Sequence, residues 1–478
     1  MLRVWLYRFA RDCKANVAVI FAIVLVPIIF LLGMTLDFSQ ALRKKEQLDA
    51  AADAAAIAAV RPAMLMQSDT VAADTANAIF MSVANSVSGL AATPTPTITV
   101  TDVGLGRTVS VSYNAASLNN FPKVLRNSAS WPISGTATSQ ASAAPNMNWY
   151  LLLDDSPSMG IGASLTDINN LITATAPANQ VVSSSQNCGF ACHENTPSAN
   201  CSSKSPCPKA VDNLSIAHAN NITLRIDLLA NALNQLFIAW TGCPQTSITT
   251  GVMQCMAALN NTTYKAALYT FDVSLNTLQT LTTPATAGTQ ISNIKLMPVD
   301  HQNCVVAGAC NTDYGTDIAG ALTSLNSIMP TPGLGSNAKG DTPQEVVFLV
   351  TDGVEDKISA TCPQATKTGF AGSSRCQQPL DMTACTTIKN RGIKIAILYT
   401  EYLQLINMGP KQNITDSWYM SWVDPYDEPD PKTGTIAQNL QACASPGFYS
   451  SVATGGDITQ ALTNLFIKVA SSTASLTQ

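Results

Sequence analysis

The chain has 478 residues, of which 12% are charged and 46% are apolar, and a formal net charge of −5. At roughly 100–200 residues per domain, this length allows two to four domains. The acidic balance leaves no basic field for phosphate groups, which argues against a nucleic-acid partner. With only three histidines and no pair at ligand spacing, the composition also argues against a His-based zinc enzyme.

An uncharged apolar segment, Asn16–Leu36, lies close to the N-terminus. Its 21 residues match the ~20 that a transmembrane helix requires. Four basic residues precede the segment and three follow it closely, so the positive-inside rule narrowly favours a cytoplasmic location for residues 1–15. The segment exceeds the 7–15 residues of a signal-peptide core, and the sequence around Asp37 is no small-residue cleavage site. We therefore predict a retained transmembrane helix over residues 16–36.

The cysteines are divided unequally by this segment. Cys13 precedes it, and twelve follow it: Cys188, Cys192, Cys201, Cys207, Cys243, Cys255, Cys304, Cys310, Cys362, Cys376, Cys385 and Cys443. This distribution predicts up to six disulfides in an oxidising compartment, with the C-terminal portion exported. The alternative is a set of buried free thiols in a cytosolic domain. The pairing does not follow from the sequence.

Two short regions follow the apolar segment. Residues 37–68 are rich in helix-forming side chains and lack Gly and Pro before Pro62, which predicts a helical stalk. Residues 69–145 combine a helical pattern over 69–90 with alternating strand patterns over 97–102 and 108–113. We expect a small α+β module there, ending in a linker.

Residues 146–478 alternate between strand and helix patterns. Continuous apolar strands are expected at 149–153, 264–271, 346–350 and 393–399, and amphipathic helices at 216–240, 318–328 and 458–469. This alternation predicts an α/β fold with a doubly wound, mainly parallel sheet and disulfide-rich insertions. In such a sheet, ligands bind outside the carboxyl ends of the strands.

Oxygen-bearing side chains follow the strands at these ends. The turn LLLDDSPSMG places Asp154, Ser156 and Ser158 after one strand, GTDIAGAL places Thr316 before a helix, and VVFLVTDG places Asp352 after another strand. These hard ligands suit Mg²⁺, Mn²⁺ or Ca²⁺, and an octahedral ion would keep one position for a partner's Asp or Glu carboxylate. No nucleophile–His pair or phosphate loop accompanies them, so the set is expected to bind. The alternative is that these residues only cap helices.

The D-x-S-x-S turn, the Thr that opens a helix and the strand–TDG turn resemble the metal-ion-dependent adhesion site of von Willebrand factor A domains. The helix RIDLLANALNQL, which starts at Arg225, resembles the first helix of that family. The resemblance implies that Asp154, Ser156, Ser158, Thr316 and Asp352 hold the metal, with Asp352 often reaching it through water. The long stretch between Ser158 and Arg225 departs from the family and can reshape or cover the metal face.

The N-terminal sequence KANVAVIFAIVLVPIIFLLGMTLDFSQALRKKEQLDAAADAAAIAA resembles the TadE/TadG-like segment of bacterial tight-adherence (Flp) pilus-assembly proteins. The usual Gly before the span is replaced by Ala15 and Asn16, which argues against prepilin-type processing. TadG-like members combine this segment with a von Willebrand A domain. The resemblance implies a non-enzymatic role in pilus assembly or adhesion, an inner-membrane location, and pilus-assembly membrane proteins or pilin as partners.

Three other interpretations remain open. Cys188, Cys192 and His193 form a variant of the c-type haem attachment motif, which would make the chain an electron carrier. A Mg²⁺-dependent hydrolase would need a base, for which Asp155 and Glu355 are the local candidates. The N-x-S/T sequons at Asn213, Asn221, Asn260, Asn261 and Asn413 would fit a eukaryotic cell-surface protein. In addition, the acidic stretch 424–432 is expected to be a solvated loop, with a calcium loop as the alternative.

Overall fold

The computed structural model describes residues 16–121, 129–178, 186–189, 193–194, 212–244, 250–299, 315–359, 374–409 and 411–471. Two compact units divide the chain, one comprising Met1–Ala143 and the other Ala144–Ala474. Each unit has its own hydrophobic core and is described by itself.

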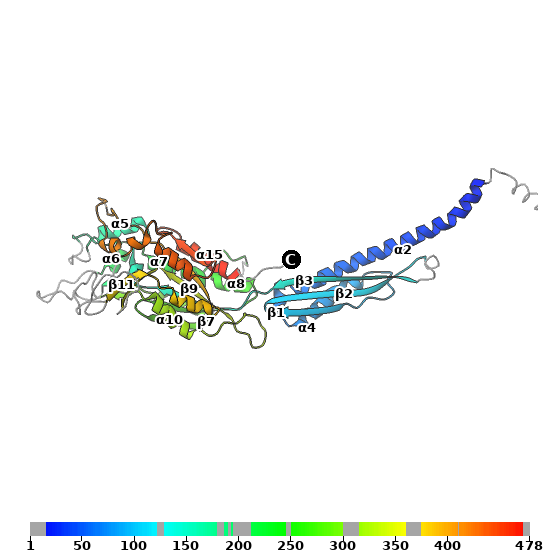
Figure 1. Ribbon diagram of the computed structural model, residues 1–478, viewed down its shortest axis with the longest axis horizontal. Helices are drawn as coiled ribbons and strands as arrows, with labels where there is room; N and C mark the ends of the chain where they lie inside the picture. The colour runs from blue at the N-terminus through cyan, green and yellow to red at the C-terminus, as the bar shows by residue number, and fades with distance from the viewer. Residues whose placement is uncertain are drawn as a thin grey trace, which may run out of the picture. The chain divides into compact units, whose positions relative to one another are not determined.

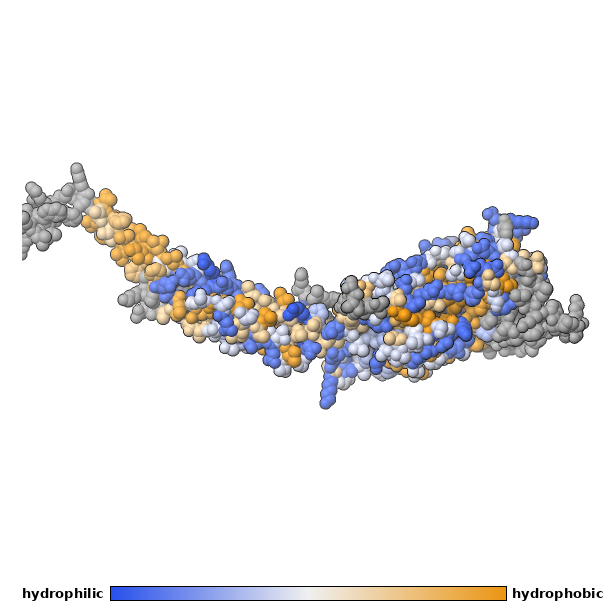
Figure 2. Space-filling model, turned by 180° about the vertical axis from the view of Figure 1, so that it is seen from behind, coloured by the Kyte–Doolittle hydropathy of each residue, from blue (hydrophilic) through white to orange (hydrophobic). Residues whose placement is uncertain are grey.

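The first unit begins with a long helix, α2 (Asn16–Ala59). The apolar side chains of its N-terminal half are exposed, and the helix is long and apolar enough to cross a membrane by length and composition. Figure 2 shows this half as a continuous hydrophobic surface. The other elements of the unit are α3 (Pro62–Leu65), α4 (Asp69–Ala84), β1 (Thr97–Val103), β2 (Gly106–Leu118) and β3 (Ser130–Ser142).

The C-terminal half of α2 packs with α4 against an antiparallel sheet of order β1-β2-β3. Alternate residues of β2 point into this core, so that Val109, Val111 and Tyr113 are buried while their neighbours are not. The buried face of α2 consists largely of alanines, whose small side chains let the helix approach the sheet closely. The residues predicted to form a stalk therefore contribute to the core of this unit.

A buried arginine fastens the helices of the first unit to its hairpin. The Arg107 guanidinium forms an ion pair with Asp102 at 2.6 Å and a second with Asp69 at 3.1 Å. It also donates hydrogen bonds to the carbonyl oxygens of Met64 and Gln67, at 2.7 and 2.8 Å. Each nitrogen of the guanidinium therefore has an acceptor, as expected for a charged side chain that is only 2% exposed.

The second unit is built on a six-stranded sheet of order β13-β12-β9-β4-β6-β7. The strands are β4 (Met147–Asp154), β6 (Tyr264–Phe271), β7 (Leu275–Thr282), β9 (Gln344–Thr351), β12 (Lys394–Thr400) and β13 (Tyr449–Val452). All neighbouring strands pair in parallel except the edge strand β7, which is antiparallel to β6. The central strands are buried along nearly their whole length, as expected for strands covered on both faces.

Helices cover both faces of this sheet. Alternate residues of β4 enter two separate cores, with Trp149, Leu151 and Leu153 in one and Tyr150 and Leu152 in the other. Figure 1 shows α7 (Arg225–Phe237) and α15 (Ile458–Ser471) on one side of the sheet and α10 (Ile318–Ile328) on the other. The unit thus has an α/β architecture with helices on both faces.

The remaining elements of the second unit are short. They are η2 (Pro157–Gly160), α5 (Leu165–Ala174), β5 (His193–Glu194), α6 (Asn213–Ala219), α8 (Val252–Leu259), α9 (Pro284–Gly288), η4 (Ile291–Asn293), β8 (Pro298–Val299), β10 (Val354–Ser359), β11 (Ser374–Pro379), α11 (Thr383–Asn390), α12 (Ser417–Trp422), α13 (Asp424–Asp427) and α14 (Thr435–Cys443).

Disulfides staple this unit, which confirms the prediction that its cysteines form disulfide bonds. Cys243 is bonded to Cys255 in α8, and Cys385 in α11 to Cys443 in α14. Cys376 is disulfide-bonded as well. Six other cysteines of the predicted set, namely Cys192, Cys201, Cys207, Cys304, Cys310 and Cys362, lie outside the described residues.

Candidate metal centre

The site is built on two adjacent parallel strands. β4 ends at Asp154 and β9 ends at Thr351, and the register pairs Leu153 with Val350, so both strands end at the same edge of the sheet. This register places Asp154 opposite Thr351 and next to the turn that carries Asp352. The Thr351 hydroxyl donates a hydrogen bond to Oδ2 of Asp154 at 2.6 Å.

The turn after β4 holds the three residues of the D-x-S-x-S spacing together. The backbone N–H of Ser156 donates to Oδ1 of Asp154 at 3.0 Å, and the hydroxyls of Ser156 and Ser158 lie 2.9 Å apart. Pro157 starts the short helix η2, which turns the chain tightly and brings the two serine side chains to the same side. Their hydroxyl oxygens and the Asp154 carboxylate therefore form one oxygen-rich corner.

Asp352 enters the same corner from the next strand. Its carboxylate is fully buried, and Oδ2 has no hydrogen-bond partner among the described residues. Burial raises the pKa of Asp352. The positive charge of Arg225 and hydrogen bonds from the hydroxyls of Ser158 and Tyr402 partly oppose this rise. Burial and the charge of Asp352 together raise the pKa of Asp154 well above its usual range. Two buried carboxyl groups thus destabilise one another's charged forms.

Thr316 lies in the turn before α10 and is 3% exposed. Its backbone pairs with Asp356 in an isolated antiparallel bridge, with N–H···O distances of 3.0 and 2.8 Å. A side chain on the preceding Gly315 would come within 3.0 Å of Pro157 Cδ, so this turn passes directly beside the 156–158 turn. Of the five predicted residues, four meet at one corner and the fifth lies on the adjoining turn.

The chemistry of this corner suits a hard cation. Two buried carboxylates repel one another here, and one of their oxygens lacks a partner among the residues that the structure describes; a positive ion between two such groups would stabilise both charges. The hydroxyls of Ser156 and Ser158 add neutral oxygen donors of the kind that Mg²⁺ and Mn²⁺ accept, and Thr316 lies on the adjoining turn. Among the described residues, no three His, Cys, Asp or Glu side chains gather as a metal site.

The corner is less open than the sequence suggests. Asp154, Ser156 and Asp352 have no exposed surface, and only Ser158 is partly exposed. Gly353, next to Asp352, lies beneath Ile436 and Leu440, since a Cβ there would come within 2.7 Å of either side chain. Helix α14 therefore covers this end of the sheet beside Asp352.

Two residues near the site were not predicted. Thr351 donates a hydrogen bond to Asp154. It directly precedes Asp352 in the strand–TDG turn, and this position in the motif is the sequence feature that could have indicated its role. Asp427 lies in the acidic stretch expected to be a solvated loop. This expectation is wrong for Asp427, which ends α13, is 2% exposed and has no hydrogen-bond partner for either oxygen among the described residues.

The residues of the other interpretations are placed only in part. Cys188 is buried, His193 lies in β5, and Cys192 is outside the described residues, so the haem motif is not described as a whole. Asp155 is 7% exposed, and burial raises its pKa to about 7. Glu355 is fully buried and accepts a hydrogen bond from the backbone of Ala319.

Comparison with known proteins identifies the N-terminal segment. Residues 15–65 match the family of Flp pilus-assembly TadE/G-like proteins, which confirms the resemblance predicted from the sequence. No curated protein matches the chain.

Solved structures of pilus proteins are similar to the chain at low identity. The vWF domain of the type V pili tip protein Mfa5 from Porphyromonas gingivalis is 10% identical with a TM-score of 0.33, and covers 70% of this chain and 99% of its own. The PilB minor pilin from Streptococcus sanguinis is 10% identical with a TM-score of 0.32, over 80% of this chain and 78% of its own. The pilus adhesin SpaC from Lactobacillus rhamnosus GG is 11% identical with a TM-score of 0.32, over 79% and 34%.

Proposed function

We propose that the chain is a membrane-anchored, non-enzymatic component of tight-adherence (Flp) pilus assembly or adhesion. In this proposal the second unit is a von Willebrand factor A-like domain, with the doubly wound, mainly parallel sheet of that family. The match of residues 15–65 to the pilus-assembly family supports the biological setting. The order of the six strands, with its antiparallel edge, supports the type of domain.

The observation that carries the proposal is the buried pair of Asp154 and Asp352, in which Oδ2 of Asp352 has no hydrogen-bond partner in the described part of the chain. Asp154, Ser156, Ser158, Thr316 and Asp352 would hold Mg²⁺ or Mn²⁺, directly or through water. A bound ion of this kind supplies an open coordination position that takes the carboxylate of a partner's Asp or Glu. The residues of this chain fix the oxygen donors and exclude bulk water, which strengthens the attraction for a partner's negative charge.

We propose a single-pass location in the bacterial inner membrane, with the second unit periplasmic or directed to the surface. The exposed apolar half of α2 supports the anchor, because its side chains have no protein partner to cover them within the described unit. The disulfides Cys243–Cys255 and Cys385–Cys443 support export, since such bonds persist in oxidising compartments. The partners would be other pilus-assembly membrane proteins or pilin.

The experiment is a chromosomal Asp154→Ala variant in the bacterium that encodes the chain. We expect surface pili or adhesion to be lost while the variant reaches wild-type amounts in the membrane, because Ala removes a metal ligand at the end of a strand. A matched Asp457→Asn variant changes an exposed Asp in the same unit and is expected to keep normal pili. Normal piliation in the Asp154→Ala strain would contradict the proposal.

A further inference from the structure

The strand that follows Asp352 holds the start of α10 at three consecutive residues. These residues, Glu355, Asp356 and Lys357 of β10, are called the bracket below. Asp356 forms the backbone bridge to Thr316 already described, and its carbonyl oxygen also accepts from Gly315 N–H at 3.1 Å. The bracket therefore contacts the segment that carries Thr316 from a strand that begins two residues after Asp352.

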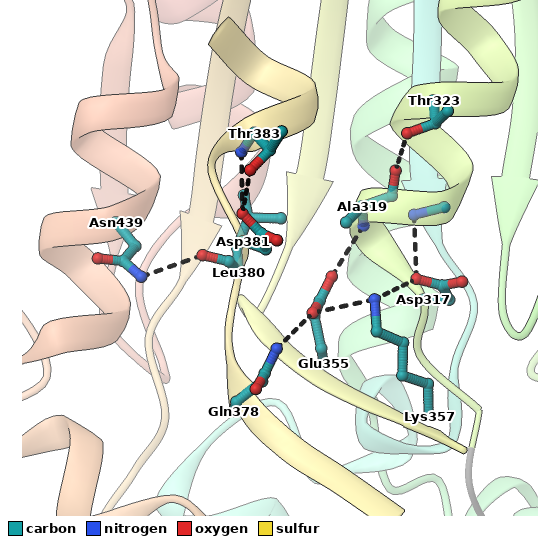
Figure 3. A network of polar contacts seen from close by, with 11 residues as sticks. Asp317, Ala319, Thr323, Glu355, Lys357, Gln378, Leu380, Asp381, Thr383 and Asn439 are labelled. Atoms are coloured by element: carbon teal, nitrogen blue, oxygen red, sulfur yellow. Dashed lines mark hydrogen bonds and ion pairs between the residues drawn. The ribbon is translucent and has the colours of Figure 1, made fainter. Parts of the chain in front are cut away.

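Glu355 makes the most buried contact of the bracket. Its Oε1 accepts a hydrogen bond from the backbone N–H of Ala319 at 2.9 Å, in the first turn of α10 (Figure 3). First-turn N–H groups have no partner within their own helix and carry the positive end of its dipole, which favours a carboxylate there. Glu355 is fully buried, and Gln378 of β11 donates to its other oxygen at 3.3 Å.

Lys357, the third residue of the bracket, forms ion pairs with Asp317 before α10 and with Glu355. Its Nζ lies 2.7 Å from Oδ1 of Asp317 and 3.2 Å from Oε2 of Glu355. The same oxygen of Asp317 caps α10 by accepting from Gly320 N–H at 3.0 Å. Asp317, which directly follows Thr316, and Ala319, three residues after Thr316, are thus both bonded to side chains of β10.

We infer that Glu355 is a positioning residue for the metal site, which sets the place of Thr316 relative to Asp352 through its hydrogen bond to Ala319. This inference rests on the proposed function. Asp352 and Glu355 are three residues apart in the same segment. The hydrogen bond that Glu355 accepts from Ala319 N–H therefore fixes the start of α10 relative to Asp352. Groups that orient metal ligands without contacting the metal typically change affinity by about 10–100-fold when they are replaced.

The test uses calorimetric titration of Mg²⁺ into the full chain in detergent, with two conservative variants of Glu355. Glu355→Gln keeps an oxygen at the same reach, so Ala319 N–H retains its acceptor, although the amide N–H₂ then faces Lys357 and Gln378. We therefore expect a lower urea midpoint but Mg²⁺ affinity within about threefold of wild type. Glu355→Asp keeps the charge but shortens the side chain by one methylene, so the hydrogen bond is lost, and we expect affinity about tenfold weaker or more. If Glu355 acted only through its negative charge, Glu355→Gln would bind Mg²⁺ more weakly than Glu355→Asp.

The matched control is Glu345→Ala. Glu345 is also a buried glutamate, but it lies at the start of β9 and accepts from Asn148 at 2.9 Å, at the other end of the strands that carry the site. We expect this variant to lower the urea midpoint in EDTA without changing Mg²⁺ affinity, which separates loss of stability from loss of positioning. Equal affinity of Glu355→Asp and wild type, or an equal loss in Glu345→Ala, would overturn the inference.

The same titration on Asp154→Ala keeps the two claims apart. If Asp154→Ala abolishes Mg²⁺ binding while Glu355→Asp leaves it unchanged, the positioning role fails and the metal site stands. If Asp154→Ala binds Mg²⁺ as well as wild type, the proposed metal site itself fails.

Discussion

The Thr351 hydroxyl donates a 2.6 Å hydrogen bond to Oδ2 of Asp154, across two adjacent parallel strands. Thr351 Oγ1 in turn accepts from the backbone N–H of Gly353 at 3.0 Å. One hydroxyl therefore joins the end of β4 to the turn that carries Asp352. This contact fixes the orientation of the Asp154 carboxylate before any ion binds.

Replacing Thr351 with Val should therefore weaken both the fold and the metal site. Val preserves the shape but leaves Asp154 Oδ2 without its donor, which should cost about 1.5–3 kcal/mol of unfolding free energy. We expect a lower urea midpoint in EDTA and weaker Mg²⁺ binding by calorimetry. Thr400→Val is the control, because the Thr400 hydroxyl at the end of β12 is buried and has no hydrogen-bond partner among the described residues. Equal effects of the two variants would contradict the orienting role of Thr351.

Replacing Arg107 with Met should loosen the first unit. The carbonyl oxygens of Met64 and Gln67 would lose their donor, and each lost hydrogen bond costs about 0.5–1.5 kcal/mol. We expect faster hydrogen exchange of the β1–β2 amides, while amides of the second unit keep wild-type rates. Arg43→Met removes an exposed arginine of α2 and should change neither. Unchanged exchange in Arg107→Met would rule out this role.

Asp427 should make the second unit less stable as the pH rises. Burial and the charge of Asp352 raise its pKa to about 7, although Arg225 opposes the shift. Between pH 4 and 7 the folded chain therefore holds a proton that the unfolded chain releases, so unfolding free energy falls as pH increases. Asp427→Asn lacks this titration, and in EDTA its stability should depend less steeply on pH than that of wild type. Identical pH profiles in urea unfolding would contradict this assignment.

The disulfides Cys385–Cys443 and Cys243–Cys255 should contribute unequally to stability. Cys385–Cys443 closes a loop of 58 residues and Cys243–Cys255 one of 12, and loop-closure entropy rises with loop length. Paired replacement by Ala should cost about 4 kcal/mol for the longer loop and about 3 kcal/mol for the shorter one. Urea unfolding followed by tryptophan fluorescence measures both. A larger loss from the Cys243–Cys255 pair would contradict the entropic account.

The central strands could be predicted because their composition leaves little choice. The strands predicted at 149–153, 264–271, 346–350 and 393–399 are confirmed by β4, β6, β9 and β12, to within one residue at the start of β12, because largely apolar runs of this length suit a sheet buried on both faces. The edge strands β7 and β13 were not predicted. β7 is half-exposed and rich in threonine and polar residues, and β13 has only four residues, so neither has a clear apolar pattern.

The turns that carry Asp154, Thr316 and Asp352 could be predicted from motif spacing, but their surroundings could not. The sequence VEDKIS gives no sign that Glu355 reaches the first turn of α10, because that contact depends on how β10 leaves the sheet. The acidic, proline-rich stretch around Asp427 has the composition of a solvated loop, and only tertiary packing buries its carboxylate. Likewise, the alanines of α2 predict a helix without indicating that its C-terminal half covers a sheet.

Calorimetric titration of Mg²⁺ into the full chain and its Asp154→Ala variant, with Asp457→Asn as a folded control, tests the metal site most directly. The account predicts one Mg²⁺ bound per wild-type or Asp457→Asn chain, and no measurable binding to Asp154→Ala. Binding of Mg²⁺ to Asp154→Ala with wild-type affinity, or no binding to the wild-type chain, would contradict it.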